Sequence, residues 1–458
     1  MTRCIALTVI ALLNAATCSI AQTNEGGLSH LDAHRMAAPP SKLLKPLGDE
    51  TLAAIIKGHE PAREQALATA LLGAALHCPV LKVGVASNGF LTAGIVKLQA
   101  GDKQSRLFSV CDVRDDAVLV VRTAFSVLPE LDHLDLWVTV PWLRDFEPVH
   151  RPVFSLSVPR ERINDCLADT GNPEEVLTRC GGVRLGPEFT AHAIDGSSGL
   201  EVQTLRCDLL IDPALDTTWR EFGALARDTG ELDDLQRGRP VAGVISGPRG
   251  SSRIALTIDD GPRPLITPLV LDILRRANVK ATFFVVGEKV EHYPELARMI
   301  VRDGHELANH SYSHIRLNEL NPRGVWSQVR GCDVAVERVT GQKMQWFRPP
   351  GGMCDDLSLQ VVNALGHATV LWTSNTADWS GIGAEEIVRN GLSGLRPGGV
   401  LLMHQGSLQS VAALPGLLRG IAAMELEPGT VSDLLTGNGV GQLPPDELVR
   451  MMDKSRVY

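Results

Sequence analysis

The sequence predicts an α/β protein with a distorted (β/α)7-type barrel in its C-terminal part and a strand-rich domain before it. After Arg253, apolar runs of strand length alternate with amphipathic helical stretches, which is typical of parallel βαβ units. The strand candidates number seven and no Gly-rich phosphate loop follows them, which favours a barrel over a nucleotide-binding sheet. Before residue 235, short Val/Leu/Phe-rich runs are separated by Gly, Asp and Pro, which indicates short strands.

The first 21 residues have the layout of a cleavable secretory signal. Arg3 precedes an apolar run, and small residues at 19–21 precede a polar segment. The apolar run is too short to span a membrane comfortably, so we expect cleavage after Ala21, export to the periplasm or the exterior, and no integral membrane segment afterwards. A lipoprotein signal ending at Cys18 is the weaker alternative, because residues 15–17 fit a lipoprotein box poorly.

The rest of the chain divides where its composition changes. A linker is indicated where Gly, Pro, Ser and charged residues gather without periodicity. We expect a flexible lead-in at 22–50 and a strand-rich domain of unknown role at 51–235, which opens with a helix near 50–76. A linker at 236–252, the barrel domain at 253–436 and a C-terminal tail at 437–458 follow. The strand candidates of the first domain include VLKVGV, RLFSVCDV, AVLVVRTAF and LDLWVTVPW.

The barrel candidates are seven strands and several intervening helices. The strands are IALTI, ATFFVV, HELAN, WFRPP, ATVLW, VLLMH and TVSDLL. The helices include TPLVLDILRRAN, YPELARMIVRDG, WSQVRGCDVAVERVTG and ALPGLLRGIAAM. Trp326, Trp346 and Trp372 lie in or beside these elements, so we expect them to pack in the core.

Charge and cysteine content exclude some functions. The formal net charge is −9 and no Lys- or Arg-rich run occurs, so nucleic acid is not expected as a partner. No CxxC spacing occurs, which argues against a cysteine zinc site. In an oxidising compartment the nearest pair, Cys166 with Cys180, is a disulfide candidate, and Cys332 with Cys354 is another.

Conspicuous polar residues follow the barrel strands. In a parallel barrel, catalytic groups lie at the C-terminal ends of the strands. Five strand candidates end in such residues, in this order: Asp259 and Asp260, His310 and His314, Arg348, Asp378 and Trp379, and His404. These side chains are therefore expected at one rim of the barrel.

These residue types suit metal-assisted hydrolysis. His310 and His314, four residues apart, could bind one ion together with Asp259 or Asp260, because two imidazoles and one carboxylate suit zinc or a similar divalent ion. The other aspartate would be a general base, and His404 a general acid. The alternatives are an Asp-Gly turn, a solvated histidine pair and a buried histidine that caps a strand.

Five short motifs resemble those of a known family. LTIDDGP, HSYSH, FRPPGG, NTADW and LLMHQ occur in the order and at the spacing of the NodB-homology polysaccharide deacetylases, carbohydrate esterase family 4. The resemblance covers roughly residues 252–435, less than half of the chain. One motif alone would be a weak signal, whereas five in order are specific.

The resemblance implies a role for each motif residue. Asp259 would be the catalytic base and Arg348 the residue that orients it, while Asp260, His310 and His314 would bind the metal. Asp378 would tune His404, the general acid. Substrate contacts would come from the backbone N–H of Gly351 toward the oxyanion, from Trp379 as a wall of the acetyl pocket and from Leu402 against the acetyl methyl group. Tyr312 is a further candidate for sugar contact, with a purely geometric role in the ligand turn as its alternative.

The chain departs from the family pattern at three positions. Gly351 stands where Tyr is common, Asn375 where Asp is frequent, and Gln405 where Asp or Glu is common. None of these changes removes a proposed ligand, base or acid. They bear on substrate choice and rate.

The expected activity is hydrolysis of N-acetyl groups on an amino-sugar polysaccharide: peptidoglycan, a chitin-like polymer or a GlcNAc exopolysaccharide. The expected cofactor is a divalent metal ion, with Zn²⁺ as the first candidate and Co²⁺ as the second. A polysaccharide O-acetyl esterase and an inactive glycan-binding barrel are the alternatives. The sequence predicts neither the polymer nor the oligomeric state.

Overall fold

The computed structural model describes most of the chain after residue 59. The described residues are 60–100, 107–144, 147–163, 177, 183–185, 204–206, 232, 235–248, 250–436 and 440–455. The predicted signal, the whole of the lead-in, and Cys166 and Cys180 lie outside these residues.

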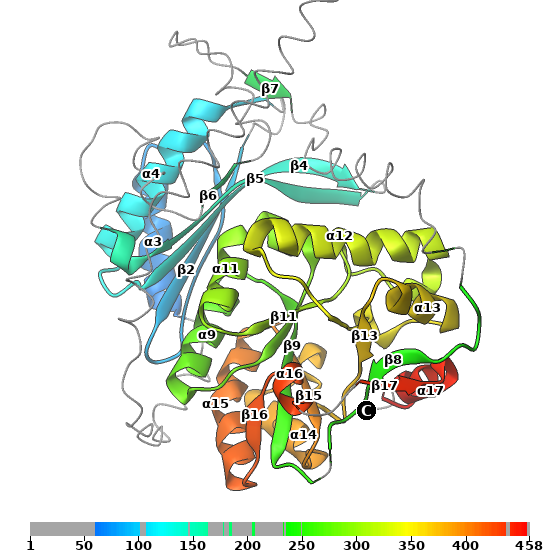
Figure 1. Cartoon of the computed structure of the whole chain (residues 1–458). Helices are drawn as coiled ribbons and strands as arrows, with labels where there is room; N and C mark the ends of the chain where they lie inside the picture. Colours follow the sequence, from blue (N-terminus) through cyan, green and yellow to red (C-terminus); the bar gives the residue numbers. More distant parts are fainter. Residues whose placement is uncertain are drawn as a thin grey trace, which may run out of the picture.

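The N-terminal part is a helix-backed sheet of five strands (Figure 1). The sheet order is β1-β2-β4-β5-β6, and β2 and β4 are parallel because α4 crosses over between them. The elements are α3 (Pro61–Gly73), β1 (Val80–Ser87), β2 (Thr92–Gln99), β3 (Leu107–Ser109), α4 (Val110–Val127), β4 (His133–Arg144), β5 (Glu147–Pro159), the 3-10 turn η1 (Arg160–Arg162), β6 (Val183–Leu185) and β7 (Thr204–Arg206).

One predicted strand of this part is wrong. AVLVVRTAF lies in helix α4, and RLFSVCDV contributes only the short strand β3 before that helix begins. The buried residues of α4 recur every three or four positions, at Val113, Ala117, Val121 and Ala124. Helical periodicity therefore decides the structure over the high β-propensity of valine.

The C-terminal part is a curled sheet surrounded by helices. Its strands are β8 (Val241–Val244), β9 (Arg253–Gly261), β10 (Thr282–Val285), β11 (Glu306–Asn309), β12 (Trp346–Phe347), β13 (Ala368–Val370), β14 (Ser374–Asn375), β15 (Val400–His404), β16 (Glu427–Gly429) and β17 (Gly441–Leu443). Its helices are α9 (Ile266–Ala277), α10 (Gly287–His292), α11 (Pro294–Arg302), α12 (Pro322–Thr340), α13 (Asp356–Ala364), α14 (Ala384–Ser393), α15 (Leu408–Ala423), α16 (Val431–Leu434) and α17 (Pro445–Ser455), with 3-10 turns η4 (Leu317–Glu319), η5 (Pro350–Gly352) and η6 (Asp378–Ser380).

The order of these strands is that of an open barrel. It runs β14-β15-β9-β10-β11-β12-β13-β8-β17, with β16 paired to β9. All pairs are parallel except β17 with β8. An apolar cluster between the strands and helices α9 and α15 forms the largest core. The predicted barrel-type α/β architecture is confirmed, and parallel strands bring their C-terminal ends to one rim.

Two predicted boundaries and one predicted strand differ from the structure. Strand β8, inside the predicted linker, pairs with β13, and β17 and α17 in the predicted tail continue the same sheet and core. TVSDLL forms helix α16, because Thr430 and Asp433 make a capping box that starts a helix. The strand is the preceding β16.

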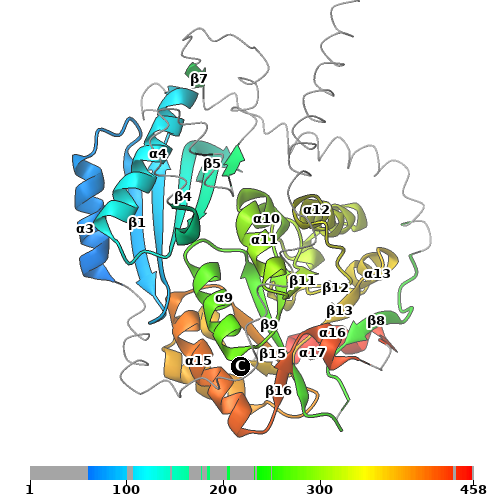
Figure 2. The ribbon, with the colours of Figure 1, turned by 60° about the vertical axis from the view of Figure 1, so that its left-hand side comes forward.

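The N-terminal sheet lies between its own helices and the barrel (Figure 2). Helices α3 and α4 cover one face, and α9 of the barrel lies on the other side. Ala86 and Ala93, from β1 and β2, belong to the same apolar cluster as the barrel core. None of the helices in the described part of the chain is both long and apolar enough to cross a membrane.

Helix α17 should contribute to barrel stability. Leu448 is fully buried against the β8 and α13 side of the core, so Leu448→Ala should lower the free energy of unfolding by about 2 to 5 kcal/mol. Glu447→Ala, an exposed neighbour in the same helix, should change it by less than about 0.5 kcal/mol. Urea denaturation measures both, and equal effects would contradict the role of α17 in the barrel.

Candidate active site

A buried ion pair lies at the centre of the barrel rim. Asp259 ends the buried part of β9, and Arg348 Nη1 donates a hydrogen bond to its Oδ1 at 2.7 Å. The other guanidinium N–H groups donate to Thr257 Oγ1 and to the carbonyls of Val370 and Leu371. Since both side chains are at most 3% exposed, this network fixes the orientation of the Asp259 carboxylate.

The Asp260 side chain is turned toward His310 and His314 at a bulge in the strand. The pairing of β9 with β10 skips Asp260, whose φ is +71°. Such a bulge redirects a side chain locally. The Asp260 Oδ1 atom lies 3.0 Å from His314 Nε2 and 3.4 Å from His310 Nε2. One ligand atom from each of the three residues lies within 4.8 Å of the others.

These three side chains fit a divalent metal ion. Asp260 Oδ1 is buried and accepts no hydrogen bond from the described residues. His310 Nδ1 is 2.8 Å from the carbonyl oxygen of Arg348, so it carries the proton and Nε2 keeps its lone pair toward Asp260. A carboxylate that binds a metal ion must be deprotonated, so Asp260 would bind the ion as the ionised group.

A hydrogen-bonded chain holds the turn that carries both histidines. Asn309 Oδ1 accepts from the backbone N–H of Ser311 at 2.8 Å, and Asn309 Nδ2 donates to Asp333 Oδ1 at 2.9 Å. The other oxygen of Asp333 is 2.9 Å from His367 Nε2. Asp333 in helix α12 and His367, the residue before β13, thus hold the turn that carries both histidines. No sequence motif indicates Asn309, Asp333 or His367.

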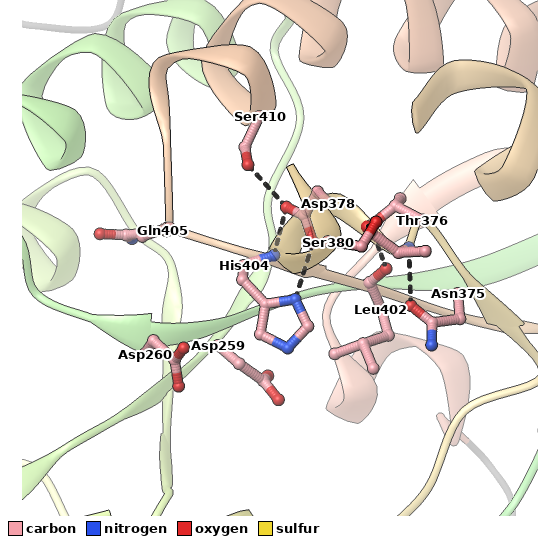
Figure 3. Close-up of polar contacts among 12 residues, drawn as sticks. Asp259, Asp260, Asn375, Thr376, Asp378, Ser380, Leu402, His404, Gln405 and Ser410 are labelled. Atoms are coloured by element: carbon pink, nitrogen blue, oxygen red, sulfur yellow. Dashed lines mark hydrogen bonds and ion pairs between the residues drawn. The ribbon is translucent and has the colours of Figure 1, made fainter. Parts of the chain in front are cut away.

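His404 is held by Asp378 on the other side of the rim (Figure 3). Its Nδ1 is 2.8 Å from Asp378 Oδ1, and its backbone N–H donates to Asp378 Oδ2. Ser410, at the start of α15, also donates to Asp378 Oδ2. Burial disfavours the charged imidazole, but the Asp378 hydrogen bond and the charges of Asp259 and Asp378 outweigh it and raise the pKa of His404 to about 9.

The two halves of the site face each other across neighbouring strands. In the parallel pair β9–β15, His404 is the register partner of Asp259 and Leu402 that of Thr257. Because side chains two apart share a strand face, Leu402 and His404 lie on the same face as Asp259 (Figure 3). A carboxylate and a protonated imidazole, with a three-residue metal site beside them, are an arrangement suited to hydrolysis.

Comparison with known proteins gives the family. The model of the family described as "Polysaccharide deacetylase" matches residues 246–370, a segment that contains Asp259, Asp260, His310, His314 and Arg348. A peptidoglycan-N-acetylglucosamine deacetylase of Bacillus cereus is 36% identical over 197 residues, which cover 42% of this chain and 72% of that protein. The chain belongs to the polysaccharide deacetylase family.

Other members of the polysaccharide deacetylase family are also similar. A chitooligosaccharide deacetylase of a Bradyrhizobium species is 38% identical over 165 residues, which cover 36% of this chain and 74% of the relative. A solved structure of the Bc1960 peptidoglycan N-acetylglucosamine deacetylase is 31% identical, with 44% of this chain and 95% of that chain covered and a TM-score of 0.42.

The remaining candidates for substrate contact differ in position. Trp379 is 64% exposed, in the turn that carries Asp378. Gly351 has φ +60° in the turn after Arg348, a conformation that favours glycine over the tyrosine common in the family. Tyr312 does not fit sugar contact, because it is 7% exposed and its hydroxyl donates to Glu291 in the α10 layer, so that prediction is corrected.

The other departures from the family pattern have internal partners. Asn375 Oδ1 accepts from the backbone N–H of Ala377, which shapes the turn before Asp378. Gln405 is fully buried, and its Oε1 accepts from Thr267 Oγ1 at 2.6 Å. The Nδ1 atom and the backbone N–H of His404 both bond to Asp378 and not to either amide, so both substitutions act through the surrounding loops.

The structure also answers the predictions about cysteines and tryptophans. Cys332 Sγ donates to the carbonyl of Val285, and Cys354 Sγ lies 3.6 Å from Met452 Sδ, so no disulfide joins these two described cysteines. Trp326 and Trp346 are buried as expected. Trp372 is only partly buried and lies 5.6 Å from the Arg348 guanidinium, beneath the rim.

One further residue near the metal ligands was missed by the sequence analysis. Lys289, in α10, donates from Nζ to the backbone carbonyl of Asp260 at 2.8 Å. Burial lowers the pKa of this lysine. The contact fixes the bulged backbone at Asp260, and no motif around Lys289 indicates it.

Asp333 should affect metal binding although it is not a ligand. Asp333→Ala removes the acceptor that orients Asn309, so the affinity for Zn²⁺ should fall by about 10- to 100-fold. Glu337→Ala, an exposed residue in the same helix, should leave the affinity unchanged. Competition with a chromogenic zinc chelator measures both, and equal affinities would contradict the bracing role.

Proposed function

We propose that this chain is a metal-dependent hydrolase that removes N-acetyl groups from an amino-sugar polysaccharide. The observation that carries the proposal is the arrangement of two proton-transfer groups around one metal-ligand set. Asp259, paired with Arg348, and His404, paired with Asp378, lie on neighbouring strand ends beside Asp260. The names of the relatives in Bacillus cereus and Bradyrhizobium support the same reaction.

Asp260, His310 and His314 would hold the metal, for which we propose Zn²⁺ because two imidazoles and one carboxylate suit it, with Co²⁺ as the alternative. When bound, such an ion polarises the acetyl carbonyl and lowers the pKa of water. Asp259 would accept the proton of the attacking water at Oδ2, the oxygen that Arg348 does not bind. That oxygen lies 3.8 Å from His310 Nε2, on the metal side.

His404 would donate a proton to the departing amine. Its Nδ1 is bound to Asp378, which leaves Nε2 as the atom that transfers the proton. With a pKa of about 9 the imidazole is protonated at neutral pH. An amine leaves far less readily than an alcohol unless it is protonated, so an acid that is protonated at neutral pH favours N-acetyl over O-acetyl substrates.

Residues at the rim of the barrel would make the substrate contacts. The backbone N–H of Gly351 would stabilise the developing oxyanion, and Leu402, 3% exposed on the His404 face, would contact the acetyl methyl group. The exposed ring of Trp379 would form a wall beside the sugar. The polymers we propose are peptidoglycan, chitin-like chains or a GlcNAc exopolysaccharide, and the leader-like residues 1–21 support export to reach them.

Acetate release tests the proposed reaction. The zinc-loaded full chain should release acetate from N-acetylated peptidoglycan or GlcNAc oligomers and far less from acetylated xylan. Asp259→Asn, which keeps the shape of the side chain but removes the base, should lower kcat by about 10²- to 10⁴-fold. Equal or greater release from xylan would favour an O-acetyl esterase. No release from any acetylated glycan, with glycan binding unchanged in Asp259→Asn, would favour an inactive binding barrel.

The pH dependence tests the acid. His404 must be protonated to act, so activity should be present below about pH 9 and lost as pH rises through that value. Asp378→Asn removes the partner that raises the pKa of His404, so the alkaline limb of kcat/KM should move down by at least about one pH unit. Trp379→Ala, beside it but outside the hydrogen bond, should leave the limb in place. An unmoved limb in Asp378→Asn would exclude His404 as the titrating acid.

A further inference from the structure

The N-terminal domain contacts the barrel through specific polar and aromatic groups. The side chain of Asn88, fully buried, donates to the carbonyl of Leu269 and to Asp272 in α9. Trp137 of β4 stacks on Tyr293, with ring centroids 4.8 Å apart. Because buried amide groups need their partners, these contacts define one docking geometry for the N-terminal domain and the barrel.

One contact reaches the loop that follows the catalytic strand. Asp135 of β4 is 0% exposed, and its Oδ2 accepts from the backbone N–H of Leu265 at 2.9 Å. Its Oδ1 accepts from Ser157 Oγ at 2.7 Å and from His133 Nε2 at 3.0 Å, both within the N-terminal domain. The carboxylate is thus held by its own domain on one side and bonded to the barrel on the other.

Leu265 lies at the far end of a short loop that begins at the metal-ligand bulge. The loop joins Gly261, the end of β9, to α9, which starts at Ile266. Both ends have left-handed backbone, with φ +71° at Asp260 and +67° at Leu265. Residues other than glycine adopt this conformation only where surrounding contacts hold it.

The other hydrogen bonds that hold the loop involve Arg263 and Asp260, and not the backbone N–H of Leu265. Arg263 donates to the carbonyls of Gln405 and Gly406, which ties the middle of the loop to the strand end that carries His404. Lys289 holds the Asp260 carbonyl. Among the described residues, the Leu265 N–H has Asp135 as its hydrogen-bond acceptor, and this acceptor comes from outside the barrel.

We propose that Asp135 is a positioning residue for the metal site. By fixing Leu265, it holds the loop in the conformation that directs the Asp260 carboxylate toward His310 and His314. The N-terminal domain, in which no motif carries chemistry, would then complete the catalytic domain by bracing its first loop. The inference rests on the proposed function for its catalytic consequence, but not for its effect on metal binding.

The alternative is that Asp135 only strengthens domain docking. Asn88→Ala is the matched comparison, because it removes buried hydrogen bonds from the same interface but acts on the middle of α9 instead of the loop. Ser157→Ala is a second comparison, since it removes one donor to Asp135 and leaves the Leu265 bond in place.

The experiment uses the full chain and its Asp135→Ala, Asp135→Asn, Asn88→Ala and Ser157→Ala variants. Competition with a chromogenic chelator measures Zn²⁺ affinity, hydrogen exchange reports on the peptide spanning 259–268, and thermal unfolding reports on docking. Asp135→Ala should bind Zn²⁺ about tenfold more weakly and exchange faster in this peptide. Asp135→Asn should fall in between, because its amide oxygen can still accept the Leu265 N–H. Asn88→Ala and Ser157→Ala should keep wild-type affinity.

The outcomes distinguish a positioning role of Asp135 from a role in domain docking alone. Equal Zn²⁺ affinity in Asp135→Ala and Asn88→Ala, at similar loss of thermal stability, would overturn the proposal. If Asp135→Ala does not fold, Asp135→Asn and the exchange of the Leu265 amide in the wild type decide, and fast wild-type exchange there would also overturn it. Loss of Zn²⁺ affinity in a chain that releases no acetate would reject the proposed function alone, while unchanged affinity in an active chain would reject the role of Asp135 alone.

Discussion

The site depends on the Arg348–Asp259 ion pair, because it bridges strands that are not neighbours. In the sheet order β9 and β13 are separated by three strands, yet the guanidinium bonds to Thr257 and Asp259 on β9 and to the carbonyls at the end of β13. Phe284 of β10 stacks beneath it at 4.1 Å. A buried charge without its partner is costly, so the position of each strand end at this rim is tied to the others through one side chain.

The sequence predicts which residues lie at the rim of the barrel, but not which residues hold them in place. Strand ends with polar residues could be read directly, because parallel strands bring their C-terminal ends together whatever the loops do. The residues that support the site, such as Asp333 behind the histidine turn and Ser410 behind Asp378, come from helices and carry no motif. Tyr312 sits inside a motif but packs into the helical layer, where its hydroxyl donates to Glu291.

The failures of secondary-structure prediction have physical causes. AVLVVRTAF was assigned from the β-propensity of its valines, although its buried positions recur with helical spacing. TVSDLL is the last of the alternating strand candidates, although Thr430 and Asp433 form a helix-starting capping box. In the first case the burial of one helix face outweighed residue preference, and in the second the capping of the first backbone N–H groups did. The strand β8 lies in a segment in which Gly, Pro, Ser and charged residues gather, which is why the sequence indicates a linker there.

The proposed acid, His404, and the proposed base, Asp259, are coupled by charge, and this coupling bears on the order of the proposed proton transfers. The negative charge of Asp259 contributes to the raised pKa of His404 across the β9–β15 pair. If Asp259 takes a proton from the attacking water, that contribution disappears and His404 becomes a stronger acid. Asp378 keeps the imidazole oriented throughout, because its two oxygens are fixed by His404 and Ser410. In the proposed mechanism, the proton transfer that activates the attacking water therefore also strengthens the acid that the leaving amine requires next.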